Sequence, residues 1–582
     1  MSPASDAEPD PTPESDRRAA LLRLLPRYVP IVGWLPRYQR ADLGPDVLGG
    51  LTSWGVMVPV ALAYASLAGL PPEYGLITAF AALAAYAVFG TSRHLRVTTS
   101  STMAVMSLSL VAPLAGGDTA QFIALSAALA LMVGALLVIA GLARLGFISE
   151  FLAKPVVTGF VFGVAVTIIV GQMPKLLGIP GTSGSVFDQL RSILQQLPDL
   201  DPLTLAVGAL SLLLILVLQR VDRRIPGPLA ALILGIAAVV AFDLAGRGVA
   251  VVGEVATLMP SIGLPDVGIG DLAYLLTGAV GIVFLAVGES LGSARSFAAR
   301  HHYEIDSDQE LVALGASNTA SGLFGGFIVD ASLSQSATAE AAGSRTQASS
   351  LLTSALVLAT ALLLAPLFEN LPQAVLGAVV IASVLSLIDL PELRRYWAWR
   401  RTDALLAAAA LIGVASTDVL AGLVIAVLLS LLMMLFRASR PYLAVLGRLP
   451  GDRAVYADVQ RHPDAAAVPG LLVLRLDAPL YFFNASVTRT EILALVDGEP
   501  TAPRVVIIDI GATGDLDVTA TDTLAELLAD LQVRGVALSL AQAKGKVRDQ
   551  LRRTGLLDRI GTTRVHFSVA QAVALEGDRV VT

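Results

Sequence analysis

The stretches VTTSSTMAV (Val97–Val105) and ASLSQSATAEA (Ala331–Ala341) decide the fold of this chain. Each is a run of hydroxyl and amide side chains that opens a short apolar segment. Each also has an extended approach, RHLRVTT for the first and GGFIVD for the second. Irregular backbone does not survive in contact with lipid, because unpaired amides cost several kcal/mol each. A matched pair in the two halves of a chain therefore predicts a substrate site that lines a cavity at membrane depth.

The composition is that of a membrane protein with many spanning segments. Of the 582 residues, 55% are hydrophobic and 15% are charged, and the mean hydropathy is +0.72. Soluble domains carry about 25% charged residues. The chain has no cysteine, which excludes disulfides and thiolate sites, and its five histidines show no metal-ligand spacing. We predict an α-helical polytopic membrane protein with no metal site.

The apolar segments and the basic residues between them predict a topology. About fourteen segments can be distinguished, several of them shorter than the ~20 residues that a straight span needs. Lysine and arginine gather in alternate loops, which places those loops and both termini in the cytosol; Arg93 and Arg96 belong to one such loop. The two interrupted segments are third and tenth in the series and enter from opposite faces. This pattern predicts an inverted seven-plus-seven repeat whose two half-helices point their N-termini at each other.

The parts outside the apolar segments predict further regions. Residues 1–40 are polar, acidic and rich in proline, which is typical of a disordered cytosolic tail. Residues 41–440 would form the membrane domain, and residues 441–468 would form a linker. Residues 469–582 alternate strand-like and helix-like runs, which predicts a small cytosolic α/β domain. Its expected strands are 471–476, 504–510 and 536–541.

Several motifs, in a fixed order from about Leu43 to Ala574, resemble one family. The membrane part resembles the SulP anion transporters, the bacterial branch of solute carrier family 26, through DVLGGLTSWGVMVPVALAYASLAGLPPEYGL, GTSRHLRV, ESLGSARSFAARHHYEIDSDQELVALGASNTASGLFGG and AGSRTQ. The run LGRLPGDRAVYADVQRHPDAAAVPGLLVLRLDAPLYFFNA resembles the linker and STAS domain of that family. The resemblance implies a multi-pass protein of the bacterial inner membrane. It also implies a homodimer that carries sulfate, bicarbonate, chloride or dicarboxylates.

The chain departs from the family pattern at the expected site. Many members have GSFSRTA in the tenth segment, whereas this chain has ASLSQSA, with Gln335 where the arginine would lie. Val60 follows Pro59 where many members have Gln, and Thr98-Thr99 stands where many have Gly-Pro. The missing arginine argues against chloride/bicarbonate exchange of the animal type.

The candidate substrate site consists of the two half-helix N-termini and neutral side chains near them. Such ends offer unpaired N–H groups and about half a positive charge each, so two of them can bind an anion without a cationic side chain. The alternative is that these small polar residues only cap and pack the helices. The candidates are Tyr64, Thr98, Thr99, Ser100, Ser101, Ser332, Ser334, Gln335 and Ser336.

Glu289, in FLAVGESLGS, is the candidate for ion coupling. A carboxylate inside an apolar segment costs about 2.5–3.5 kcal/mol and is a functional candidate by default. It could carry a proton, or it could ligate sodium together with Ser293 one turn later. The alternative is a hydrogen bond that only holds the surrounding helices together. Asp330, just before the second half-helix, would be either an N-cap or an outer gate residue.

The C-terminal domain offers one candidate for modification. Asp517 and Thr519 match the acid and the phosphoacceptor of STAS relatives that antagonise anti-sigma factors, although Ala520 replaces the following glycine. The alternative is an ordinary N-cap by Thr519 or Thr521. The domain shows no nucleophile–base pair and no phosphate loop, so no enzymatic activity is predicted.

These patterns favour a secondary transporter that moves a small oxyanion inward, with sulfate the first choice of substrate. Protons or sodium would be the coupling ion, and no other cofactor and no nucleic-acid partner are expected. Bicarbonate or dicarboxylate symport is the alternative within transport. An anion channel and an anion sensor that signals through the STAS domain are the alternatives in other classes.

Overall fold

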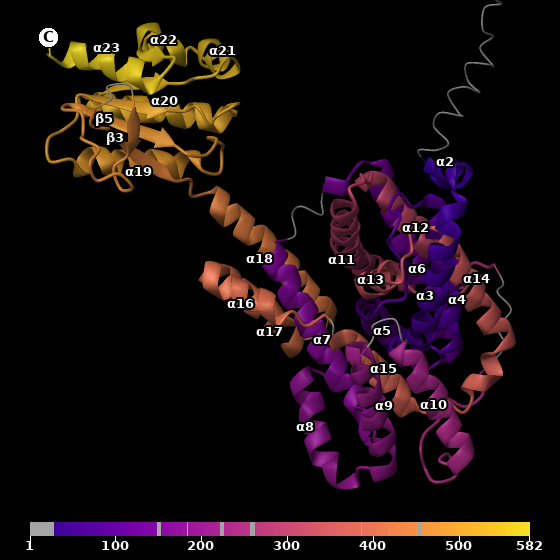
Figure 1. The fold of residues 1–582 in the computed structure, drawn as a ribbon. Helices are drawn as coiled ribbons and strands as arrows, with labels where there is room; N and C mark the ends of the chain where they lie inside the picture. The colour runs from indigo at the N-terminus through magenta and orange to yellow at the C-terminus, as the bar shows by residue number, and fades with distance from the viewer. Residues whose placement is uncertain are drawn as a thin grey trace, which may run out of the picture. The chain divides into compact units, whose positions relative to one another are not determined.

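The computed structural model describes residues 28–147, 153–182, 184–221, 226–255, 262–385, 387–417, 419–451 and 455–581. The chain divides into two units between Ser430 and Leu431. The first unit is almost entirely helical, and the second combines a sheet with helices (Figure 1). The tail predicted to be disordered lies partly outside the described residues, at 1–27. Residues 31–37 of that tail are helical, so the prediction is wrong there.

The first unit consists of two series of elements with the same opening order. Each series begins with two long helices, which are followed by a two-residue strand and a short helix. The first series is α3 (Arg40–Leu67), α4 (Glu73–Phe89), β1 (Val97–Thr98), α5 (Ser101–Ala115), α6 (Thr119–Leu142), α7 (Lys154–Leu177), α8 (Val186–Gln196), α9 (Pro202–Val221) and α10 (Gly227–Phe242). The second is α11 (Ile269–His301), α12 (Ser307–Leu323), β2 (Asp330–Ala331), α13 (Leu333–Ala341), α14 (Ala348–Leu363), α15 (Gln373–Leu385), α16 (Leu390–Trp399) and α17 (Arg401–Ser416). The helix α18 (Val419–Ala438) follows and contains the boundary between the two units.

The helices have the length and composition of membrane spans. Within the described residues, six helical stretches of 20 to 33 residues are apolar enough to cross a membrane. Five shorter apolar helices accompany them, α5 among them. A short helix can reach only part of the way across a ~30 Å core. The helical membrane fold is therefore as predicted, while the number of fourteen spans stays a prediction.

The helices of the two series pack into two groups that mix both series. One group contains α3–α6 and α11–α14, and the other contains α7, α9, α10, α15 and α17 (Figure 1). Glycines let α6 and α12 approach closely: a methyl group at Gly134 would come within 2.8 Å of the Thr319 backbone nitrogen. Close approach through small residues is how helices associate within membranes.

The second unit is a six-stranded sheet in the order β4-β3-β5-β6-β7-β8. The strands β5 to β8 are parallel, and β3 pairs antiparallel with both β4 and β5. Its elements are β3 (Leu443–Arg448), β4 (Tyr456–Asp458), β5 (Leu471–Leu476), α19 (Ala485–Gly498), β6 (Val505–Asp509), α20 (Val518–Val533), β7 (Ala537–Ala541), α21 (Gly545–Arg553), α22 (Leu556–Ile560), β8 (Val565–His566) and α23 (Val569–Val581).

The three strands predicted in this unit form, but the predicted linker is wrong in part. Residues 441–468 contain β3 and β4, which extend the sheet beyond β5. The reason is that β3 carries enough apolar side chains to be buried. Leu443, Ala444 and Leu446 are all buried, the first two opposite β5. Proline, glycine and charge around this strand concealed it in the sequence.

Candidate functional site

The two interrupted stretches meet in the middle of the first unit. The strands β1 and β2 pair antiparallel, with Val97 opposite Ala331 and Thr98 opposite Asp330. Each strand leads directly into its half-helix, α5 or α13. The hydroxyl of Ser100 accepts a hydrogen bond from the amide of Met103 (3.3 Å), and Ser332 caps α13 in the same way. Segments far apart in the sequence therefore bring two helix N-termini to one place.

Side chains from neighbouring helices satisfy the irregular backbone before β2. The amide of Asn318 replaces a strand partner for Val329: its oxygen accepts from the Val329 N–H, and its nitrogen donates to the Val329 carbonyl, both at 2.9 Å. The Ser321 hydroxyl donates to the Phe327 carbonyl (2.6 Å), and Ser290 accepts from the Ala331 amide (3.1 Å). These contacts meet the requirement that buried backbone groups be paired.

The approach to β1 is satisfied in the same manner. The side chain of Gln347 donates to the carbonyl oxygens of Ser92 (2.7 Å) and Leu95 (2.9 Å). The two stretches also bond each other, since the Ser332 amide donates to the Arg96 carbonyl (2.9 Å). Both approaches are thus held rigidly, which fixes the positions of the helix ends.

Four backbone N–H groups at these helix ends have no acceptor within the described parts of the chain. They belong to the first two residues of each half-helix: Ser101 and Thr102 in α5, and Leu333 and Ser334 in α13. The first four N–H groups of any α-helix lack an intrahelical partner. Here the caps satisfy the later ones and leave two at each end. Together with the helix dipoles, these donors favour a negatively charged ligand.

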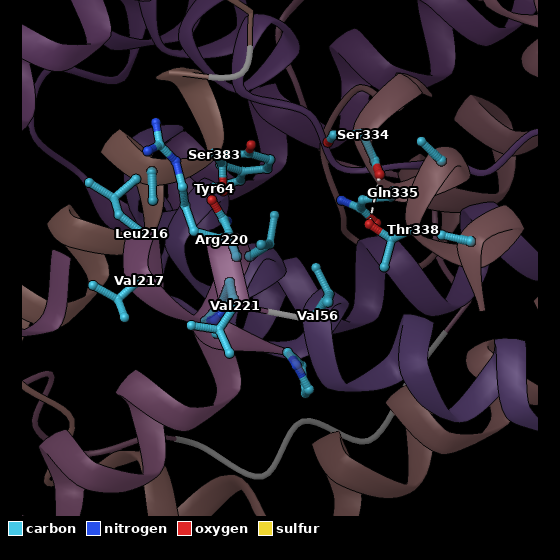
Figure 2. Close-up of a pocket in the computed structure, with 18 residues that line it drawn as sticks. Val56, Tyr64, Leu216, Val217, Arg220, Val221, Ser334, Gln335, Thr338 and Ser383 are labelled. Atoms are coloured by element: carbon cyan, nitrogen blue, oxygen red, sulfur yellow. Dashed lines mark hydrogen bonds between the residues drawn. The ribbon is translucent and has the colours of Figure 1, made fainter. Parts of the chain in front are cut away.

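A cavity of about 1020 Å³ lies against α13 and separates it from α9. Figure 2 shows Ser334, Gln335 and Thr338 of α13 on one side and Leu216 and Val217 of α9 on the other. The walls also include residues of α3, α10 and α15. The cavity is therefore bounded by both helix groups, so a movement of one group against the other would change its access.

The candidate residues divide into those that line the cavity and those in the crossing, where β1 pairs with β2. Tyr64, Ser334 and Gln335 line the cavity, and the Tyr64 phenol approaches the hydroxyls of Ser101 and Ser383. The other candidates lie at the crossing, the region where β1 pairs with β2 and the two half-helices begin. Ser100 and Ser332 cap the half-helices, and Ser336 accepts from the Arg96 amide (2.8 Å). Thr98 donates to the Met57 sulfur, Ser101 faces the Tyr64 phenol, and the Thr99 hydroxyl is unpaired among the described residues.

Arg96 is not an exposed loop residue. Arg96 was expected in a cytosolic loop, but it is completely buried behind the α13 N-terminus. Its guanidinium donates to the hydroxyls of Ser344, Ser349 and Ser350, and it forms no ion pair within the described residues. Arg220, in the last turn of α9, is exposed and lines the cavity. A count of positive charges per loop cannot distinguish a buried arginine such as Arg96 from exposed ones.

Glu289 lies on α11, partly accessible, and its carboxyl group contacts that of Asp330. Asp330 is fully buried in β2. It is not the N-cap of α13, because Ser332 holds that position. Ser293 is half-buried one turn further along α11. Its predicted role beside Glu289 stays a prediction.

Thr519 in the second unit is exposed in the first turn of α20. The N-cap of this helix is Asp517, which accepts from the Ala520 amide (2.7 Å), so the predicted capping by Thr519 or Thr521 is wrong. A carboxylate caps better than a threonine hydroxyl at a positive helix end. Phosphorylation of Thr519 stays a prediction.

A second cavity, of about 710 Å³, lies at the carboxyl edge of the parallel strands in the second unit. Asp509, at the end of β6, lines it, and burial raises the pKa of this carboxyl group. Arg475 and Asp477 form an ion pair in the same wall. The wall therefore contains one ion pair and one further carboxyl group, that of Asp509.

Comparison with known proteins identifies the family. The profile of the Sulfate permease family matches residues 43–410. This chain belongs to that family. A profile of the STAS domain matches residues 462–572. A relative named "Probable sulfate transporter" from Mycobacterium tuberculosis is 37% identical over 93% of this chain and 98% of its own length. "Sulfate transporter 3.1" of Arabidopsis thaliana is 31% identical over 94% of this chain and 86% of its own length.

Solved structures show the same fold for this sulfate permease family member. Murine Slc26a9, described as an anion transporter in the inward-facing state, matches with a TM-score of 0.86 over 99% of both chains, at 21% identity. The transmembrane domain of the cyanobacterial bicarbonate transporter BicA matches with a TM-score of 0.60. That match covers 67% of this chain and 98% of the other, at 25% identity. The chain is therefore a multi-pass membrane anion transporter with a C-terminal STAS domain.

Proposed function

We propose that this protein is a secondary-active transporter that takes up sulfate together with protons or sodium. The observation that carries the proposal is the pair of half-helix ends, whose four free N–H groups lie next to the paired strands β1 and β2. One of the four residues, Ser334, lines the cavity. The names of two relatives support the choice of anion. The bacterial one is named "Probable sulfate transporter" and the plant one "Sulfate transporter 3.1".

The donors at the helix ends suit an oxyanion that has several acceptor atoms. Each net hydrogen bond contributes about 0.5–1.5 kcal/mol, and more when the acceptor is charged. Backbone donors held by paired approaches need no reorganisation when the anion binds. Gln335 and Tyr64 line the same cavity and add neutral side chains that can donate hydrogen bonds.

Glu289 supplies the coupling in this proposal. A carboxylate close to an anion site opposes anion binding, and a bound proton or sodium ion removes that opposition. Anion and cation would then bind together and cross together. Ser293 would contribute a hydroxyl oxygen if the cation were sodium.

Radiolabelled sulfate uptake into proteoliposomes under imposed pH and sodium gradients tests the proposal. The full chain is expected to accumulate sulfate against the sulfate concentration gradient when either the pH gradient or the sodium gradient is imposed. Uptake should saturate with sulfate concentration, and bicarbonate and a dicarboxylate should compete weakly. Glu289→Gln is expected to lower accumulation at least tenfold while sulfate/sulfate exchange persists, because binding remains and coupling is lost.

Glu304→Gln, which changes an exposed carboxylate beyond the end of α11, is the matched control and should behave as the wild type. Uptake that is the same with and without the pH and sodium gradients would contradict the proposal. A sulfate current that does not saturate with sulfate concentration would contradict it as well.

A further inference from the structure

The side chain of Asp330 has no role in the site described so far. It is fully buried, and neither carboxylate oxygen has a hydrogen-bond donor with good geometry among the described residues. Its position is fixed by the pairing of β2 with β1, so it cannot swing out to solvent without breaking the crossing. Buried polar groups are nearly always paired, so an unpaired aspartate between two helix ends requires an explanation.

The groups that face Asp330 are acidic or neutral. From α11 comes the carboxyl of Glu289, in direct contact. The hydroxyl of Ser100 approaches from the cap of α5, and the phenol of Tyr64 lies near it on α3. The nearest described cation on the approaches to the strands, Arg96, directs its guanidinium to serines around the start of α14 instead.

Two carboxyl groups in contact, without a cation, cannot both hold a negative charge at low cost. A divalent anion arriving at the neighbouring helix ends raises that cost further. The arrangement is stable with the anion bound when each carboxyl holds a proton. Glu289 alone can neutralise only one of the two charges of sulfate.

We propose that Asp330 is a second proton-carrying residue, so that one divalent oxyanion crosses with two protons, one on Asp330 and one on Glu289. Each carboxylate takes a proton from the side on which the anion enters and forms an O–H bond. Both O–H bonds break on the other side after the anion has left. The cycle moves two protons and one dianion, so it carries no net charge. This inference rests on the proposed proton-coupled uptake of sulfate.

The accumulation ratio of sulfate at equilibrium tests the proposal, because it counts protons and does not depend on rate. Proteoliposomes with the full chain are held at zero membrane potential in sodium-free buffer with a one-unit pH gradient, acid outside. Two protons predict a 100-fold accumulation for the wild type, unchanged when an inside-negative potential is imposed. Asp330→Asn is expected to give a 10-fold ratio, which falls when the potential is imposed.

Two further variants keep the test decisive. Asp330→Glu keeps a carboxyl group and is expected to restore the 100-fold ratio. Asp330→Thr, whose side chain suits a strand, is expected to give a 10-fold ratio and replaces Asp330→Asn if that variant reconstitutes poorly. A wild-type ratio of 10, or a ratio of 100 in both Asn and Thr variants, would overturn the role of Asp330. Absence of any pH-driven accumulation in the wild type, or accumulation that follows sodium instead, would overturn the proton-coupled function on which the inference rests.

Discussion

Asn318→Leu is expected to abolish sulfate uptake and to destabilise the membrane domain. The leucine has nearly the same shape, but it leaves both the N–H and the carbonyl of Val329 unpaired in a fully buried position. Each unsatisfied buried group costs about 1–3 kcal/mol, so the expected loss is about 2–6 kcal/mol. The loss falls on the approach to β2, which positions the α13 N-terminus. Thermal unfolding in detergent and uptake in proteoliposomes measure the two effects.

Ser317→Ala is the matched control, because its hydroxyl is equally buried but bonds only the Ala313 carbonyl of its own helix. It is expected to change the unfolding temperature little. If Asn318→Leu were as stable and as active as Ser317→Ala, this prediction would be contradicted. The hydrogen bonds between the Asn318 side chain and the Val329 backbone would then not stabilise the crossing.

Arg96→Met is expected to leave the fold intact and to weaken the binding of divalent anions. A buried charge without an opposite charge beside it carries a desolvation cost, which an apolar side chain of similar length removes together with the hydrogen bonds. The hydroxyls of Ser344 and Ser349 bond each other at 2.5 Å and stay satisfied without the guanidinium. The lost charge acts over distance: at roughly 10 Å and an effective dielectric constant of 20, one unit charge contributes about 1.7 kcal/mol per unit of anion charge. For divalent sulfate this amounts to about 3.4 kcal/mol, so the KM should rise about 300-fold.

The dependence on anion charge separates this electrostatic effect from a general disturbance. A monovalent competitor should lose roughly half as much binding free energy as sulfate. Arg345→Met is the control, since Arg345 is exposed and pairs with Asp42 where solvent screens it. Equal loss of affinity for monovalent and divalent anions would contradict the electrostatic account.

The crossing could be predicted from the sequence because its signals are local. Serine and threonine runs before short apolar segments indicate helix caps, and Ser100 and Ser332 form them. The equivalent positions of the two runs in the chain halves predicted that they would meet, and β1 and β2 pair.

The remaining features depend on contacts between distant segments. Nothing local distinguishes Arg96, which is buried among serines around the start of α14, from the exposed arginines of other loops. The contact between Glu289 and Asp330 joins α11 to β2, and neither residue's own neighbours reveal it. Local sequence reports how a segment begins and ends, while the charge balance of the site arises only when the segments are assembled.

The most direct test concerns the claim that neutral donors at two helix ends hold the anion. Equilibrium binding of radiolabelled sulfate to the purified protein is measured for the wild type, for Gln335→Glu, and for Gln373→Glu as an exposed control. The first substitution keeps the side-chain shape but places a negative charge in the first turn of α13. Like charges about 4 Å apart repel by about 4 kcal/mol at an effective dielectric constant of 20, so binding should fall at least 100-fold. The control should bind as the wild type does. Equal sulfate affinity in all three proteins would show that the anion binds elsewhere.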